Sequence, residues 1–127
     1  MNVKEIALFQ FNRRKNQIMI IEIHSPNLKV DDETLDGVKR KVLSLSHLSE
    51  NVSRAEIFLT EENERPKENK TCKIRLDIFG DTLFVHKDAD TFENAAASAV
   101  KILKRRLKKR NEHRSEPPDE ITSTVNI

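Results

Sequence analysis

The chain of 127 residues has few of the residue types from which several common kinds of site are built. Its one cysteine, Cys72, excludes an internal disulfide and leaves no zinc-ligand spacing. Its two glycines, Gly37 and Gly80, are too few for a glycine-rich loop around a phosphate. It has no run of about 18 apolar residues and no secretory pattern at its N-terminus. We therefore expect a cytoplasmic protein with no cofactor, no metal site and no membrane partner.

The polar residues also lack a recognisable catalytic group. The four histidines do not form helical pairs with a carboxylate, and the serines beside His47 are better explained as solvent-facing residues. The acidic run from Glu61 to Glu64 is typical of a solvated loop. We expect that the protein is not an enzyme and has no catalytic residues.

The positive charge is concentrated in one segment, although the net charge is only +2. Residues 101–114 carry a net charge of +7 and residues 1–17 carry +3, whereas residues 18–100 carry −5 and residues 115–127 carry −3. A short, strongly basic segment in an otherwise acidic chain indicates a polyanionic partner.

The apolar pattern predicts an α+β fold with the element order β-α-β-β-β-α. Alternation predicts strands over 18–24, 52–60, 71–79 and 82–87, the last two joined into a hairpin by a turn at Gly80. Three- and four-residue spacing predicts helices from Asp31 or Asp32 to about residue 48, and over about 91–110. The clearest strand places Lys73 and Arg75 outward and has as its inward residues Cys72, Ile74, Leu76 and Ile78. A four-stranded sheet with both helices packed on one face buries these stripes economically.

This pattern divides the chain into a domain over residues 18–112 and two flanking segments. Residues 1–17 are compatible with a short extra strand, a basic arm or the product of an upstream start codon, and we favour a weakly ordered arm. Residues 113–127 are predicted to form a flexible acidic tail after the second helix.

The candidate binding residues are basic side chains on the polar sides of the two predicted helices. They are Lys39, Arg40, Lys41, Lys101, Lys104, Arg105, Lys108 and Lys109. If both helices pack on one sheet face, these residues form a continuous surface suited to the phosphates of A-form RNA. The alternative is an ordinary solvated surface that complements the helix dipole.

The aromatic content argues against recognition of single strands. Tryptophan and tyrosine are absent, and most of the six phenylalanines fall in the predicted core pattern, with Phe58 at an outward position. A platform on which bases stack is therefore not expected.

Several motifs occur in an order that resembles a known family. They are Met19-Ile-Ile-Glu-Ile23, Val38-Lys-Arg-Lys41-Val42 with Leu45, Leu83-Phe-Val-His-Lys87 after the hairpin, Ala89-Asp90-Thr-Phe92 with Ala95-Ala96, and Lys101-Ile-Leu103. Over residues 19 to about 110, this series resembles the ribosome hibernation promoting factor and ribosome-associated inhibitor family, also called the sigma-54 modulation protein family. The chain departs from the family pattern at Ser44, where a second lysine is common, and at Phe92, which replaces a tyrosine.

The resemblance implies a fold similar to the double-stranded RNA-binding fold and binding to 16S rRNA in the 30S or 70S ribosome, near the decoding region. It assigns Lys41 to the first-helix lysine of the family, and it places on the basic side of the second helix Lys101, Lys104, Arg105 and Lys108. It also implies a short form without the C-terminal dimerisation domain. Two other functions stay open: a general structured-RNA-binding module, and a protein-interaction regulator of transcription.

Overall fold

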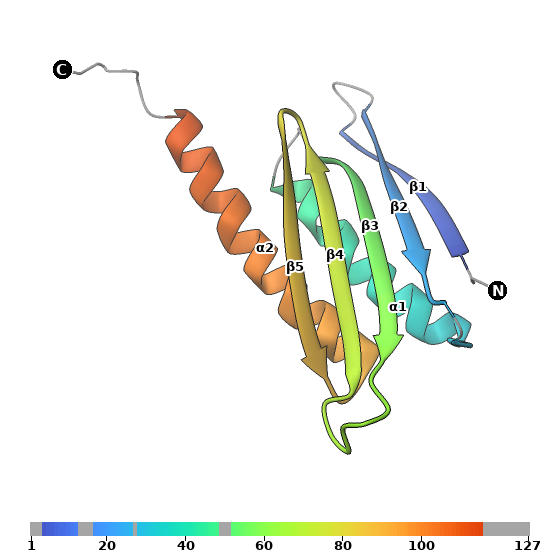
Figure 1. Ribbon diagram of the computed structural model, residues 1–127. Helices are drawn as coiled ribbons and strands as arrows, with labels where there is room; N and C mark the ends of the chain where they lie inside the picture. The colour runs from blue at the N-terminus through green and yellow to red at the C-terminus, as the bar shows by residue number, and fades with distance from the viewer. Residues whose placement is uncertain (1–3, 13–16, 27, 49–51, 116–127) are drawn as a thin grey trace.

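The computed structural model describes residues 4–12, 17–26, 28–48 and 52–115, with side chains over 19–26, 28–46, 48 and 52–110. Within these ranges the chain forms five strands, two α-helices and a short 3-10 helix, η1 (Figure 1). In chain order these elements are β1 (Lys4–Asn12), β2 (Gln17–His24), α1 (Asp32–Leu43), η1 (Ser44–His47), β3 (Val52–Glu61), β4 (Lys70–Ile78), β5 (Asp81–Ala89) and α2 (Phe92–Ser115).

The strands form one mixed sheet in the order β1-β2-β3-β4-β5. β2 and β3 are parallel and are connected through α1, whereas the other neighbouring strands are antiparallel. Both helices cover the same face of the sheet, which we call the inner face, and the opposite outer face is turned toward the viewer in Figure 1. From β2 to α2, this arrangement confirms the predicted β-α-β-β-β-α fold.

The hydrophobic core lies between the inner face and the two helices. In β4 the side chains of Lys73 and Arg75 are exposed, and the alternating inward positions are buried as predicted, at Cys72, Ile74, Leu76 and Ile78. The helices close the core with Leu35, Val38, Val42 and Leu45 from α1 and η1, and with Ala95, Ala96, Ala99, Leu103 and Leu107 from α2. The small alanine side chains let the first half of α2 approach the sheet closely.

Gly80 explains the tight connection between β4 and β5. Its φ is +82°, a backbone conformation that residues with a side chain rarely adopt. Only Phe79 and Gly80 separate the two strands. The hairpin predicted at this glycine is therefore confirmed.

The N-terminal segment differs from the weakly ordered arm that we predicted. Residues Lys4–Asn12 form β1, which pairs with β2 in antiparallel register from Lys4 opposite His24 to Asn12 opposite Gln17. The sheet therefore has five strands instead of four. The physical reason is that β2 would otherwise leave its edge unpaired, and a neighbouring strand satisfies those backbone groups. The basic residues at 13–15 lie outside the described residues.

The second helix is longer than predicted. It continues to Ser115, so the first three residues assigned to the acidic tail are helical, and the rest of that tail, from residue 116, lies outside the described residues. Lysine, arginine and glutamate have good helix propensity, which lets α2 extend past Leu107, the last buried residue among the described side chains. No helix in the described ranges is long and apolar enough to cross a membrane.

Candidate RNA-binding surface

The first helix begins at a well-formed cap and ends with its basic residues. The Asp31 carboxylate accepts a hydrogen bond of 3.1 Å from the backbone N–H of Thr34. Hydrogen bonding from the Thr34 side chain, together with this backbone bond, lowers the pKa of Asp31. Asp32 and Glu33 follow in the first turn, and Arg40 and Lys41 lie in the last turn. The acidic residues lie at the positive N-terminal end of the helix dipole and the basic residues at its negative C-terminal end, so the dipole stabilises both pairs of charges.

The second helix carries the densest cluster of exposed cations. Its buried residues occupy one side, ending at Leu103 and Leu107. The opposite side is formed by Lys101, Lys104, Arg105, Lys108 and Lys109. All five are exposed, and none of their side chains forms an ion pair or hydrogen bond with another residue in the described part of the chain. Their charges are therefore available to an external anion. We call these five residues the α2 basic face.

The two helices bring their basic residues near each other. α1 and α2 start at the same end of the sheet and run in the same direction (Figure 1), and a Cβ at Gly37 would meet the carboxylate of Glu93. From this contact, Arg40 is three residues along α1 and Lys101 is eight residues along α2, so their positions differ by about 8 Å along the axes. Packed helix axes lie about 8 to 10 Å apart, so the two backbone positions are about 11 to 13 Å apart. This is close to the Debye length of about 10 Å at 0.1 M salt, so the potentials of the two clusters overlap in part.

Three other basic side chains of the helices have internal partners. Arg106 donates a hydrogen bond of 2.7 Å to the carbonyl oxygen of Phe84, and Arg110 forms an ion pair of 3.0 Å with Asp81. Lys39, one of the predicted binding residues, is only 17% exposed at its side chain, and its Nζ lies 3.7 Å from Asp36. The arginines hold α2 against β5, and Lys39 is less available to a ligand than Arg40, which is exposed.

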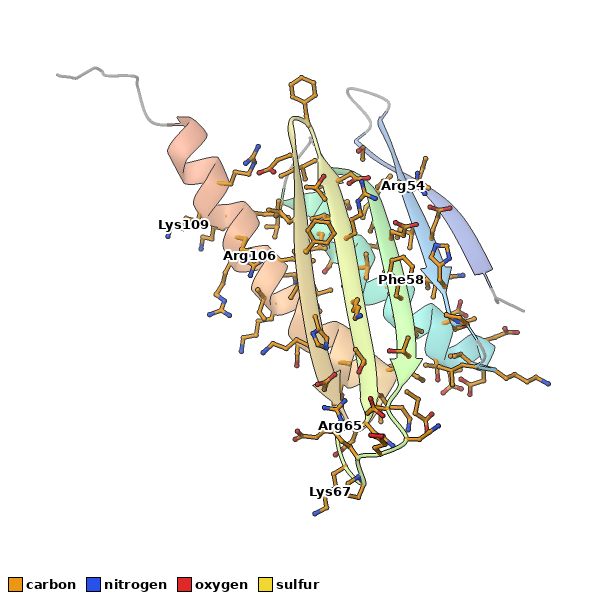
Figure 2. All side chains as sticks on the ribbon, in the orientation of Figure 1. Arg54, Phe58, Arg65, Lys67, Arg106 and Lys109 are labelled. Carbon is orange, nitrogen blue, oxygen red and sulfur yellow. The ribbon has the colours of Figure 1, made fainter. Side chains whose placement is uncertain are left out.

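A cluster of ionisable groups lies on the outer face. Glu22, His24 and Glu56 each offer one ligand atom, and these atoms lie within 4.8 Å of one another. The Arg54 guanidinium, however, is hydrogen-bonded to Glu22 and lies 3.8 Å from Glu56, whose Oε2 is 3.2 Å from His24 Nε2. A protein cation therefore already neutralises the carboxylates, and the cluster is explained as an ion-pair network between β2 and β3 (Figure 2).

A second charged network fixes the loop between β3 and β4. Asp88 accepts hydrogen bonds of 2.9 Å from Arg65 and 2.6 Å from the Thr71 hydroxyl. These bonds lower the pKa of Asp88, and the hydrogen bond that Arg65 donates to Asp88 raises the pKa of Arg65. On the inner face, burial raises the pKa of the Cys72 thiol to about 12, so this cysteine is a core residue and not a nucleophile.

The aromatic residues do not follow the predicted core pattern. Phe79 and Phe84 are 75% and 65% exposed, and Phe58 lies on the outer face, stacked on His24 with ring centroids 4.8 Å apart. Our prediction that most phenylalanines lie in the core is thus wrong for the described residues. The alternation in β3 already placed Phe58 outward, but Phe84 lies in an apolar run with Leu83 and Val85, from which the sequence alone does not assign a face.

A family model and two solved structures are similar to this chain. The family model described as sigma 54 modulation protein / S30EA ribosomal protein matches residues 21–115. The N-terminal domain of Protein Y from Thermus thermophilus has a similar fold, with a TM-score of 0.59 and 22% identity over 71% of this chain and 93% of that domain. A ribosomal subunit interface protein from Coxiella burnetii gives a TM-score of 0.60 and 12% identity over 69% of this chain and 92% of its own. A comparison with curated protein sequences gives no significant match. Because the family model covers well over half of the sequence, the chain belongs to the sigma 54 modulation protein / S30EA ribosomal protein family.

Proposed function

We propose that this protein binds the small ribosomal subunit in the cytoplasm, through the basic residues of α1 and α2, and inhibits translation by idle ribosomes. The observation that carries the proposal is the α2 basic face, whose five cations are exposed and have no ion-pair partner among the described residues. When a polyanion binds this face, its condensed counterions are released and binding is favoured, and none of these five cations has to break an internal ion pair with a described residue. Family membership and the name of the Coxiella burnetii structure make ribosomal RNA the polyanion of choice.

Within the small subunit, we place the protein near the decoding region of 16S rRNA. Lysine and arginine ends on a helical layer contact phosphates and shape, not base edges, so they suit a folded RNA surface. A protein at the decoding region excludes mRNA and tRNA, which accounts for the proposed inhibition. Chemical probing of 16S rRNA in purified 30S subunits tests this placement, and protections confined to sites outside the decoding region would contradict it.

Sedimentation tests the ribosomal target itself. In a sucrose gradient of stationary-phase lysate at low salt, we expect the protein in the 30S and 70S fractions. Reversal of three charges, by Lys101→Glu, Arg105→Glu and Lys108→Glu, should leave the protein at the top of the gradient. Wild-type protein that stays at the top under the same conditions would refute ribosome binding.

A general structured-RNA-binding module is the second candidate. It is favoured by the chemistry of the α2 basic face, because lysine and arginine recognise phosphates that every RNA duplex shares. A competition experiment separates the two functions. Unlabelled duplex RNA and unlabelled 30S subunits are each added to the complex of the protein with 30S subunits. Equal displacement by the two competitors supports the general module. A protein-interaction regulator of transcription predicts instead that the triple charge reversal leaves its activity intact.

A further inference from the structure

We propose that the outer face of the sheet binds a short single-stranded RNA segment, with two unstacked bases held by Phe58 and Phe84. This site is separate from the α2 basic face, because the two helices cover the opposite face of the sheet (Figure 1). The choice of RNA as the nucleic acid rests on the family, whereas the recognition of stacked bases and phosphates rests on the geometry of the outer face.

The outer face is hollowed between the two phenylalanines. A cavity of about 480 Å³ opens there, and its lining includes Glu56, Phe58, Lys73, Arg75, Phe84 and His86. Phe84 is 65% exposed, and the ring of Phe58 is backed by His24 at an interplanar angle of 13° (Figure 2). A base stacks best on a ring that is exposed and held in one orientation. Phe84 is the more exposed ring, and Phe58 is the ring whose orientation His24 fixes.

Two cations lie on the strand between the rings. In the register of the sheet, Lys73 of β4 is opposite Phe58 of β3, and Arg75 of β4 is opposite Phe84 of β5. The Lys73 side chain is exposed and has no ion pair or hydrogen bond with other described residues. Arg75 is 48% exposed at its side chain and lies 3.3 Å from Asp77. A phosphate that joins two bound nucleotides would therefore cross β4 beside these cations.

The spacing of the rings fits bases that are not stacked on each other. Phe58 and Phe84 are two strands apart and two residues out of register, which separates their backbone positions by about 12 Å. Neighbouring bases in a duplex strand are about 3.4 Å apart. Only a single strand with splayed bases can place one base on each ring. Proteins recognise loops and ends of RNA in this splayed conformation.

The acidic residue in the cavity does not oppose an RNA strand strongly. Glu56 has one carboxylate oxygen 3.2 Å from His24 and 3.8 Å from Arg54, and the other 3.9 Å from Arg75. Its negative charge is therefore offset by neighbouring side chains. Charge complementarity with Lys73 and Arg75 thus favours an anionic ligand over a purely apolar protein segment. The two rings favour a single-stranded nucleic acid over an acidic protein segment, because its bases can stack on them.

Intrinsic fluorescence offers a direct test, because the protein contains no tryptophan or tyrosine. We would introduce one fluorophore by Phe84→Trp and titrate the full chain with a short oligouridylate RNA. The indole should be quenched to saturation as a base stacks on it. The matched control is Phe79→Trp, which places a similarly exposed ring in the hairpin turn outside the cavity lining, and its emission should not change. Equal quenching in both variants, or none in either, would overturn the proposal.

Affinity supplies the second readout. Phe84→Ala should weaken binding of the same RNA about 5- to 150-fold, and Phe79→Ala should leave it unchanged. Lys73→Gln should lower the salt dependence by about 0.7 in the log–log slope. Unchanged affinity of the Phe84→Ala variant would refute the site. A change in oligomeric state in that variant alone would also refute it, because the occupant would then be a second copy of the chain. Tighter binding of a DNA oligomer of the same sequence would overturn the choice of RNA. Because no ribosome is present, failure here is distinct from failure of ribosome binding.

Discussion

Neutralising the α2 basic face should strongly reduce the salt dependence of RNA binding and should leave the structure of α2 nearly unchanged. The perturbation replaces all five residues of that face, Lys101, Lys104, Arg105, Lys108 and Lys109, by glutamine. Each side chain is exposed and has no ion pair with another described residue, so its removal breaks no internal contact. Glutamine keeps good helix propensity, so α2 should form as before.

The magnitude follows from the number of available cations. The α2 basic face contributes five, and Arg40 and Lys41 of α1 bring the total to seven. If each neutralises one phosphate, the log–log slope of affinity against salt is about −6.3 for the wild type and about −1.8 for the variant. Between about 50 and 200 mM salt, the wild type should lose affinity roughly 6,000-fold and the variant roughly 12-fold.

The assay is binding to a fluorescent RNA duplex of about 16 base pairs, the length that a double-stranded RNA-binding domain spans, at several salt concentrations. The matched control is Arg106→Gln with Arg110→Gln, which also removes cations from α2. Because these arginines contact Phe84 and Asp81, the control should keep the wild-type slope and lose about 1 to 2 kcal/mol of stability. A slope that falls equally in both variants, or in neither, would refute the assignment of phosphate contacts to the α2 basic face.

Three further predictions concern stability. Asp88→Asn should lower the free energy of unfolding at neutral pH by about 1 to 3 kcal/mol, because it weakens the bonds from Arg65 and Thr71. Since the pKa of Asp88 is lowered in the folded state, its contribution is present above the ordinary carboxyl pKa of about 4 and is lost as the pH falls toward the lowered value. Urea titrations should thus show the gap between wild type and variant narrowing below about pH 4, and a constant gap would contradict this linkage. Leu103→Ala, at a fully buried position, should cost about 2 to 5 kcal/mol in the same assay, and a cost below about 1 kcal/mol would show that the core is not packed as described. The Cys72 thiol, with a pKa raised to about 12, should react with a disulfide reagent only in denaturant, and rapid reaction of the native protein would contradict its burial.

The part of the fold that follows local pattern was predictable from the sequence. Lys73 and Arg75 alternate with buried residues in β4, and Gly80 marks the turn, so both the face and the hairpin follow from neighbouring residues. Whether residues 4–12 form a strand depends instead on whether the edge of β2 is left open. Their apolar residues were compatible with a strand, but only the open side of β2 decides that they pair.

The candidate site shows the same division. The cationic sides of both helices could be read from residue spacing, including the exposed Lys101 and Lys104. Which basic residues are already paired could not, because Arg106 reaches a carbonyl 22 residues away in sequence and Arg110 a carboxylate 29 residues away. The outward position of Phe84 also depends on strand register, because an apolar run has no alternation from which to assign a face.

The paired arginines bear on how the basic face works. Past the alanine-rich first half of α2, Leu103 and Leu107 hold one side of the helix in the core, and Arg106 and Arg110 tie it to β5. The cations of this segment, such as Lys109 (Figure 2), therefore project from a helix whose axis is fixed. A fixed axis lowers the entropy lost when several phosphates are bound at once. The α2 basic face thus combines cations that have no partner among the described residues with a rigid support, which is what the proposed contact with a folded RNA requires.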